Sequence, residues 1–487
     1  MLHLFLKNIN IKSTLKSFYF LSIFVLFLNT GSALEPVKTQ AWFHPNDPSL
    51  YEIAKILSQA KSSIDIAMYN MTVSESNPIV ESLLKKDIQK RIYNSELKIR
   101  IIFQGYGSKE SKFLKLQKLE DMGIDVKYFS KSKKLHHKFA VIDGNTVDAK
   151  LITGSANWSL SSYNNYNDNI LYFANSPLLS KSYQREFNFL WEKSTEFGNQ
   201  KIYKSYHNLS TQTPEQTPEQ TSVQTSVQTV TENGVKTYFN SKILSKPSKN
   251  KKNINAADYI LTNKIVEKIN QAKNTINIAT TRIKLFPIYS ALLKAAKRGV
   301  NINIIVTMAQ YETFYKRKKN NLTICKYEFS PKCSIGIKYS TLLEKDSLTY
   351  KNIAVRIKYF DFRPDQSIQK QMHHKYIIID NKYVLTGSFN WSFSSEFQHI
   401  ENLLFIDAHY YPNMINQFKK DFASLWINNR DKFDSLYNNL KENFKQSIKF
   451  KCAIDPISLS YSQIDKIRKL ILEYKRKTKT RRLNLCL

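Results

Sequence analysis

The segment MHHKYIIIDNKYVLTGSFNWS, Met372–Ser392, decides the fold of this chain, because a close copy, LHHKFAVIDGNTVDAKLITGSANWS, occurs earlier at Leu135–Ser159. Each copy places two histidines and a lysine at the start of an apolar stretch with strand character. A second strand follows and ends in Gly-Ser-x-Asn. A motif of this length that occurs twice predicts two related structural units in one chain.

Further parallels extend the repeat over most of the sequence. The segment 56–68 (ILSQAKSSIDIAM) matches 267–280 (EKINQAKNTINIAT), and 97–104 (LKIRIIFQ) matches 300–307 (VNINIIVT) as a short apolar strand. Stretches with helical character fall between these strands. Strands that alternate with helices in this way predict an α/β fold with two similar domains, each a mixed β-sheet flanked by helices.

Low-complexity sequence separates the two halves. Residues 211–230 repeat Gln, Thr, Pro and Val without an apolar face, and such a segment cannot bury enough surface to fold. We therefore expect a solvated linker at 206–234 between domains at 37–205 and 235–430. A polar helical region with a basic tail is expected at 431–487.

The first 33 residues have the pattern of a secretory signal. Lysines at positions 7, 12 and 16 precede an apolar run, Phe18–Leu28, and small residues follow at Gly31–Ala33. The run has eleven residues, whereas about 20 are needed to span a bilayer. We expect a secreted or periplasmic protein, with an uncleaved membrane anchor as the alternative.

The charge of the chain predicts an anionic partner. Its 73 Lys and Arg outnumber 40 Asp and Glu, giving a net charge of +33, which suits an anionic phospholipid surface or nucleic acid. The four cysteines lack the spacing of a metal site, so neither a metal nor another cofactor is expected. Two of them, Cys325 and Cys333, fall in an insertion at 310–350 that lengthens the second half and is a candidate specificity loop.

The histidine doublets carry the candidate chemistry. Alternate residues of a strand share a face, so His136 and Lys138 point one way, as do His373 and Lys375. The second histidine of each doublet points the opposite way and is expected to pack beneath the site. Each half thus offers one imidazole on its working face, and two halves are needed for one site. The candidate catalytic residues are His136, Lys138, Asp143, His373, Lys375 and Asp380.

The Gly-Ser-x-Asn turns and two later acids complete the candidate site. Lysine charge, hydroxyls and amides suit an anionic phosphoryl group, so Ser155, Asn157, Ser388 and Asn390 are expected to hold its oxygens. Asp168 and Glu401 lie at matching distances after the two turns. A carboxylate there would accept a hydrogen bond from the distal imidazole nitrogen and fix its tautomer.

H-x-K-x4-D followed by Gly-Ser-x-Asn, twice in one chain, resembles the phospholipase D superfamily. The second copy, His373–Asn390, fits the family pattern without a gap. The first has ten residues instead of six between Asp143 and Gly154, which an excursion of a hairpin tip near Val147–Lys150 would explain. Asp168 stands where the family usually has the longer glutamate. The resemblance covers both halves, but neither the linker nor the tail.

The resemblance implies a metal-independent phosphodiesterase whose site lies on a pseudo-twofold axis between two α/β domains. In the usual family order His136 would be the nucleophile and His373 the general acid and base. Asp143 and Asp380 would be structural supports. The chain would then be a monomer that contains an intramolecular pseudo-dimer.

Three functions remain open at this stage. The first is an exported phospholipase D-type enzyme that hydrolyses or transfers phospholipid head groups through a phosphohistidine, leaving phosphatidic acid. The second is a metal-independent endonuclease of the same superfamily. The third is an inactive module that binds nucleic acid or anionic lipid.

Overall fold

The computed structural model describes residues 39–105, 110–129, 133–197, 231–232, 234–245, 254–308, 349–361, 369–445 and 455–478. All of these belong to one compact unit, Thr39–Leu487. The expected signal sequence, most of the expected linker, nearly all of the insertion at 310–350 and all four cysteines lie outside the described residues. Within the described ranges, the helices are too short or too polar to cross a membrane.

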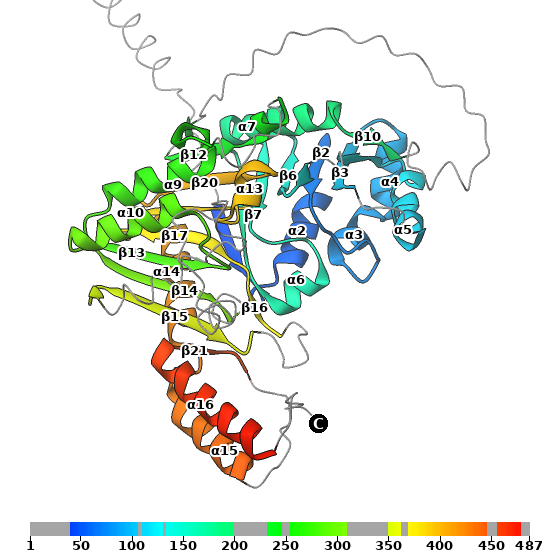
Figure 1. The fold of residues 1–487 in the computed structure, drawn as a ribbon. Helices are drawn as coiled ribbons and strands as arrows, with labels where there is room; N and C mark the ends of the chain where they lie inside the picture. The colour runs from blue at the N-terminus through cyan, green and yellow to red at the C-terminus, as the bar shows by residue number, and fades with distance from the viewer. Residues whose placement is uncertain are drawn as a thin grey trace, which may run out of the picture. The chain divides into compact units, whose positions relative to one another are not determined.

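The first half folds as an eight-stranded mixed sheet (Figure 1). Its central strands β2, β3 and β4 run parallel, and the strands on either side pair antiparallel. In spatial order the strands are β1 (Thr39–Phe43), β9 (Asn169–Phe173), β7 (Lys150–Gly154), β6 (Lys138–Ile142), β2 (Ser63–Met68), β3 (Lys98–Gln104), β4 (Asp125–Phe129) and β10 (Thr195–Glu196). Its helices are α2 (Ser49–Ser58), α3 (Pro78–Leu83), α4 (Lys86–Tyr93), α5 (Glu110–Asp121), α6 (Leu160–Asn165) and α7 (Pro177–Glu192).

The second half repeats this arrangement with one additional edge strand. Its strands are β11 (Thr231–Glu232), β12 (Val235–Phe239), β20 (Asn402–Asp407), β18 (Tyr383–Gly387), β17 (Lys375–Ile379), β13 (Thr275–Thr280), β14 (Asn301–Thr307), β15 (Ile353–Tyr359) and β21 (Ile457–Leu459). Its α-helices are α9 (Ile260–Gln271), α10 (Phe286–Lys297), α13 (Phe393–Phe397), α14 (Pro412–Ile427), α15 (Phe433–Lys445) and α16 (Tyr461–Thr478). Short 3-10 helices form at η2 (Ser241–Ser245), η4 (Ala256–Asp258) and η5 (Arg430–Lys432).

The two sheets have the same strand order, which confirms the predicted α/β fold with two similar domains. The order β1-β9-β7-β6-β2-β3-β4 corresponds strand by strand to β12-β20-β18-β17-β13-β14-β15. Each half buries its own apolar core, because the Ile-rich strands of each sheet pack against the apolar faces of its helices. Trp158 and Trp391, which follow the two turn asparagines, are each 1% exposed.

Two very short sheets join the halves. Strand β5 (Lys134–Leu135) pairs in parallel with β19 (His399–Ile400), and β16 (Gln371–Met372) pairs in parallel with β8 (Tyr166–Asn167). Each of these pairs has one strand from each half. The hydrogen bonds therefore fix the register of one half against the other beside the histidine motifs.

The long helices α7 and α14 also cross between the halves. Helix α7 packs against β12, and its Glu186 accepts a hydrogen bond of 2.8 Å from the hydroxyl of Ser241. Helix α14 packs against β1, where Gln417 accepts a hydrogen bond from the backbone of Ala41. The two helices thus make equivalent contacts and hold the pseudo-twofold arrangement.

The structure corrects two of the expected boundaries. Thr231–Glu232, placed in the linker, forms strand β11 and pairs with β12. The region after residue 430 is not a separate appendage, since β21 pairs with β15 and extends the second sheet. Ile464 and Ile467 of α16 are buried in the second core. The region is polar overall, so its composition alone did not predict that a few apolar residues attach it to the core of the second half.

Candidate active site

The short sheets between the halves bring each motif histidine to an acid of the other half. Strand β5 leads directly into His136, while its partner β19 leads directly into Glu401. The backbone N–H of His136 donates to the carbonyl of Ile400 at 3.0 Å. In the second pair, the N–H of His373 donates to the carbonyl of Asn167 at 3.0 Å, next to Asp168. Backbone pairing thereby places one carboxylate beside each imidazole.

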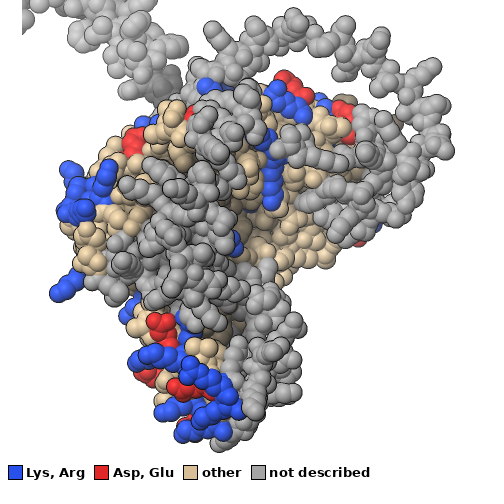
Figure 2. All heavy atoms as spheres, viewed as in Figure 1, with Lys and Arg blue, Asp and Glu red and all other residues tan. Residues whose placement is uncertain are grey.

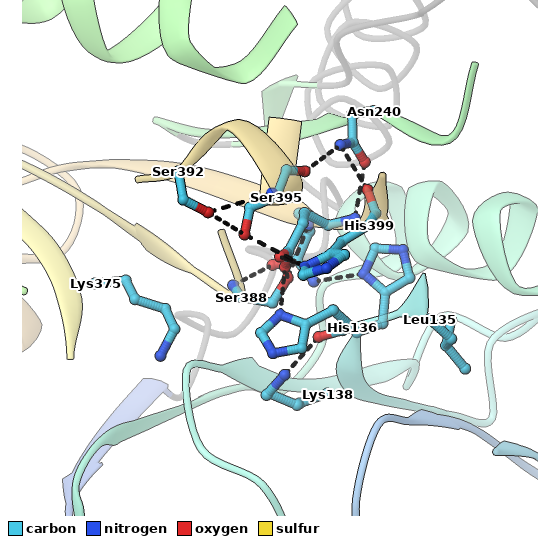
Figure 3. Close-up of polar contacts among 12 residues, drawn as sticks. Leu135, His136, Lys138, Asn240, Lys375, Ser388, Ser392, Ser395 and His399 are labelled. Carbon is cyan, nitrogen blue, oxygen red and sulfur yellow. Dashed lines mark hydrogen bonds and ion pairs between the residues drawn. The ribbon is translucent and has the colours of Figure 1, made fainter. Parts of the chain in front are cut away.

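Both imidazoles are held by these carboxylates through Nδ1. His136 Nδ1 lies 2.8 Å from Oε2 of Glu401, and His373 Nδ1 lies 2.7 Å from Oδ2 of Asp168. An ionised carboxylate accepts the Nδ1–H proton and leaves Nε2 as the nitrogen available for chemistry. His136 lies between His399 and Lys138 in the view of Figure 3.

Burial and charge set the protonation of these pairs. Burial lowers the pKa of His136 well below its ordinary value, although Glu401 acts in the opposite direction, and it lowers the pKa of His373 in the same way. Burial would raise the pKa of Glu401, but His136 and Lys138 outweigh it and hold that pKa well below its usual range. The pKa of Asp168 is likewise depressed, because His373 and Lys375 outweigh its burial. The resting arrangement is a neutral imidazole beside an ionised carboxylate in each half.

The two motif lysines lie on the same strand faces as their histidines. Lys138 and Lys375 are each 1% exposed, and each Nζ donates to the backbone carbonyl of the histidine two residues earlier. Burial lowers the pKa of both ammonium groups. The charge of Lys375 is among those that act on Lys138, so the two halves contribute their lysines to one shared site. An anion held between the halves would be stabilised by both charges.

The serines of the Gly-Ser turns correct the prediction that they hold phosphoryl oxygens. Ser155 Oγ donates to Asp168 at 2.7 Å, and Ser388 Oγ donates to Glu401 at 2.6 Å. A hydroxyl has one proton to donate, and both serines are fully buried. They fix the carboxylates that hold the imidazoles.

The glycines before these serines permit a close approach of two chains. Gly154 and Gly387 have φ near +143° and +145°, and a Cβ on either would lie about 2.5 Å from the carbonyl oxygen of the facing strand β9 or β20. Only glycine fits there without displacing the backbone that carries the acids. The turn asparagines are equivalent in sequence. Asn157 lies two residues before Ser159, and Asn390 lies directly before Trp391. The Oδ1 of Asn157 is buried without a hydrogen-bond partner among the described residues.

Asp143 and Asp380 lie at the far ends of β6 and β17, away from the imidazole pairs. Asp143 has a positive φ and accepts backbone hydrogen bonds from residues 61–63, which begin β2. Asp380 accepts the equivalent bonds from residues 273–275. Their contacts are those of turn-fixing residues. The first-half excursion lies in the neighbouring β6–β7 connection, where Val147 is 79% exposed.

The second histidine of each doublet forms a layer beneath the site. His137 Nε2 lies 3.0 Å from Glu186 of α7, and its Nδ1 accepts from Asn402 of the other half. His374 lies 3.3 Å from Asp421 of α14, and its Nδ1 contacts Asn169. An asparagine follows each acid in the sequence, and these contacts with Asn402 and Asn169 could not be predicted from it.

His399 is a site residue that the sequence pattern did not predict, because it belongs to neither copy of the histidine motif. Its ring centroid lies 5.6 Å from that of His136, and its Nδ1 lies 3.6 Å from Oε1 of Glu401. One feature of the sequence could have identified His399. It lies two residues before Glu401, as Tyr166 lies two residues before Asp168.

Among the described residues, His136, His399 and Glu401 form one group with donor atoms close enough for a metal ion, within 4.8 Å of one another. The surrounding contacts do not suit a cation. Glu401 Oε2 and His136 Nδ1 already hydrogen-bond to each other, and Ser388 occupies the same carboxylate oxygen. The Lys138 ammonium acts on both groups and would repel a divalent ion. We therefore treat the cluster as a proton-handling site.

The comparison with protein families matches both halves of the chain. The family model described as "Cardiolipin synthase, PLD-like domain" matches residues 53–191 and 265–426, which together exceed half of the sequence. The two matched ranges contain both histidine motifs, both Gly-Ser turns and both acids.

Individual relatives match smaller parts. The mitochondrial cardiolipin hydrolase of Xenopus laevis is 39% identical over 75 residues, 15% of this chain and 33% of that protein. The protein of the same name from Danio rerio is 27% identical over 152 residues, 31% of this chain and 60% of that protein. The chain thus spans a third to three fifths of the length of these relatives.

The phosphatidylserine synthase structure of Haemophilus influenzae Rd KW20 superimposes with a TM-score of 0.48 and 13% identity, over 79% of this chain and 87% of that one. Family membership does not rest on this likeness. It rests on the family model, which covers the duplicated motif, and on the paired sheets that carry it. The chain belongs to the phospholipase D superfamily.

Proposed function

We propose that the protein is a phospholipase D-type phosphodiesterase that cleaves phospholipid head groups through a phosphohistidine intermediate. The observation that carries the proposal is the pair of imidazoles whose Nδ1 atoms are each tied to a carboxylate of the opposite half. One imidazole alone would supply a nucleophile or an acid. Two such groups in one site supply both.

The reaction has two steps. Nε2 of one histidine attacks phosphorus and forms a P–N bond, and the P–O bond to the head group breaks. The other histidine first takes up a proton at Nε2 from solvent, becoming an imidazolium, and then gives that proton to the departing oxygen. That second histidine then removes a proton from water, which attacks phosphorus and breaks the P–N bond. With a phospholipid the products are a free head group and phosphatidic acid, and an alcohol in place of water would give transfer.

The lysines and carboxylates support both steps. Lys138 and Lys375 would hold the nonbridging oxygens, whose negative charge increases as the bond to the leaving group breaks. Glu401 and Asp168 would stabilise the positive imidazole ring that forms at Nδ1 when Nε2 binds phosphorus or a proton. We take His136 as the nucleophile and His373 as the acid and base, following the usual family order.

Three observations favour phospholipid as the substrate. The family model and the relatives carry names that refer to cardiolipin, a phospholipid. The net charge of +33 would attract the protein to an anionic bilayer. In Figure 2 the lobe formed by α15 and α16 carries blue side chains with red ones among them. Exposed cationic residues of α16 include Lys466, Lys469, Arg476 and Lys477. On the pattern of the N-terminal residues we also propose that the protein is exported.

The test incubates the full chain, in excess EDTA, with vesicles of cardiolipin or phosphatidylcholine and separately with plasmid and single-stranded DNA. Release of phosphatidic acid or of a free head group from vesicles supports the proposal. Nicking of DNA without lipid cleavage would instead establish the endonuclease. Activity that EDTA abolishes would refute the metal-independent mechanism.

The histidine variants separate catalysis from binding. His136→Ala and His373→Ala should each abolish turnover, and wild-type enzyme quenched with denaturant at alkaline pH should carry the phosphatidyl group on one histidine. The matched control is His409→Ala, which removes a histidine that lies outside the site. A fully active His136→Ala or His373→Ala variant would refute the shared site. Vesicle binding without cleavage by the wild type would identify an inactive binding module.

A further inference from the structure

The two halves of the site differ in the ring that lies beside each motif imidazole. Tyr166, on β8, lies 5.1 Å from His373 between ring centroids. His399, at the equivalent place on β19, lies 5.6 Å from His136. One half therefore has a phenol next to its imidazole, and the other has a second imidazole. Burial raises the pKa of Tyr166 above its ordinary value, so the phenol stays neutral near neutral pH.

The carboxylates of the two halves are also satisfied differently. Asp168 has hydrogen-bond partners at both oxygens, because Oδ1 accepts from Ser155 while Oδ2 contacts His373 and accepts from Ser162 at 3.1 Å. On Glu401 a single oxygen, Oε2, contacts both His136 and Ser388. Its Oε1 is buried and has no hydrogen bond among the described residues.

The position of Ser395 explains this difference. Ser395 is the counterpart of Ser162, but its hydroxyl lies near Ser392 and 3.5 Å from Nδ1 of His399. It does not contact Glu401. In the second half His399 takes the place of the serine hydroxyl that Ser162 supplies to Asp168 in the first half. Its Nδ1 lies 3.6 Å from Oε1 of Glu401. Figure 3 shows His399 between Ser395 and His136.

We infer that His399 is a positioning residue that holds Oε1 of Glu401, so that its own proton governs how much of the carboxylate charge reaches His136. This inference rests on the proposed function only in giving His136 a role in the reaction. The structural relationship among His399, Glu401 and His136 can be tested without any substrate.

The electrostatics give the direction of the effect. A protonated His399 would donate to Glu401 and place a positive charge near His136, and both changes weaken the binding of a proton by His136. The other groups beside His136 are Lys138 on β6, whose charge acts on it, and Tyr69 after β2, whose ring centroid lies 4.9 Å from that of His136. Lys134 on β5 and Lys375 on β17 act on Lys138. His399 retains 21% of its side-chain exposure, so it can exchange protons with solvent.

The chain itself supplies the matched variants. His399→Tyr installs the residue that the other half already accommodates, and Tyr166→His makes the reciprocal change beside His373. His399→Gln is a smaller neutral replacement that guards against a folding defect in the tyrosine variant. Each is compared with the wild type as the full chain.

The measurement is an NMR titration of histidine ¹³Cε1 resonances, with His136 and His373 assigned by the resonance missing from each alanine variant. In His399→Tyr and His399→Gln the titration midpoint of His136 should move to higher pH, while that of His373 stays in place. In Tyr166→His the midpoint of His373 should fall. An unchanged His136 midpoint in both His399 variants would overturn the inference.

Activity provides the second readout. If the wild type cleaves phospholipid, the limb of its pH–rate profile that belongs to His136 should shift to higher pH in His399→Tyr, whereas a packing role would lower the rate equally at every pH. A rate loss that is equal at every pH would overturn the inference and leave the proposed function intact. A wild type without activity would refute the proposed function, and the NMR titration would still test His399.

Discussion

Nδ1 of His136 lies 2.8 Å from Oε2 of Glu401, a residue 265 positions later in the chain. The pair exists because β5 and β19, one from each half, lie side by side and end at these two residues. The same relationship joins His373 to Asp168 through β16 and β8. Neither half therefore pairs its motif histidine, His136 or His373, with a carboxylate of its own. The duplication assembles the site, and it does not provide two independent copies.

The carboxylate partners should contribute to turnover. Glu401→Gln keeps the size of the side chain but removes its charge, so the positive imidazole formed during the reaction loses its counterion. We expect a loss of about 10–100-fold in kcat, and a similar loss for Asp168→Asn. Steady-state kinetics on vesicles, with circular dichroism to confirm folding, would measure it.

The control for these variants is Glu186→Gln. It makes the same chemical change at a carboxylate–imidazole pair, since Glu186 lies 3.0 Å from His137 on the opposite face of the strand. Its kcat should remain close to that of the wild type. A loss at Glu186 as large as at Glu401 would mean that the effect comes from general destabilisation.

The buried lysines should matter through their charge. Lys138→Met and Lys375→Met retain the aliphatic stem but remove the ammonium that would hold the phosphoryl oxygens. We expect kcat to fall by about 10²–10³-fold for each, as for the loss of one transition-state donor elsewhere. Lys61→Met is the control, because its ammonium forms an exposed pair with Asp148. Equal kcat values for Lys138→Met and the wild type would exclude a role for that charge.

The sequence predicted which strand face carries the chemistry, because side chains alternate with a period of two along β6 and β17. It also identified Asp168 and Glu401 by their matching positions. It did not reveal which imidazole each acid holds, since the strands that pair them are two residues long and have no periodic pattern. Long-range backbone pairing of this kind follows from tertiary packing.

The misassigned residues have related causes. Ser155 and Ser388 have the right chemistry for a phosphoryl group, but their single protons go to the nearby carboxylates. His399 lacks a motif of its own and enters the site only because β19 pairs with β5. A sequence pattern indicates which groups are present, whereas their partners depend on how the two halves dock.

Asp143 should stabilise the fold without taking part in the chemistry. Burial raises the pKa of its carboxyl, but hydrogen bonds from the backbone N–H groups of residues 61–63 outweigh this and hold the pKa below its usual value. Asp143→Asn should lower the free energy of unfolding by about 1–3 kcal/mol, because hydrogen bonds to a charged acceptor are the stronger ones. Activity per folded molecule should be retained. Urea denaturation beside vesicle assays would separate the two effects.

The stabilisation by Asp143 should also depend on pH. A carboxyl whose pKa is lower in the folded state stabilises the protein above its unfolded pKa of about 3.9, and this contribution disappears as the pH falls through the folded value. The denaturation midpoint of the wild type should therefore fall more steeply below pH 4 than that of Asp143→Asn. Parallel curves for the two proteins would contradict this assignment.

Lys358 and Asp361 are two buried groups whose charges act on each other, and Lys358 supports the second half of the site through Asn167. They are 2% and 0% exposed, and Nζ of Lys358 donates to Oδ1 of Asn167, whose backbone holds His373. Lys358→Met removes the cation that acts on this carboxyl and leaves Oδ1 of Asn167 without its donor, which should destabilise the protein by about 1–3 kcal/mol. Adding Asp361→Asn should recover part of that loss. Urea denaturation of both single variants and the double variant would measure the coupling, and strictly additive losses would contradict it.

The same pair should give the stability curve a minimum near neutral pH. Burial raises the pKa of Asp361 to about 7, so the folded state binds more protons than the unfolded state between about pH 4 and 7, and stability falls over that range. Burial lowers the pKa of Lys358 to about 8, so the unfolded state binds more protons between about pH 8 and 10, and stability rises there. The Lys358→Met/Asp361→Asn variant lacks both titrating groups and should lose both slopes. Urea midpoints at about pH 5 and 9.5, one in each range, and at about pH 7.5, at the minimum between them, would show this. A double variant with the same pH dependence as the wild type would rule out the pair as its source.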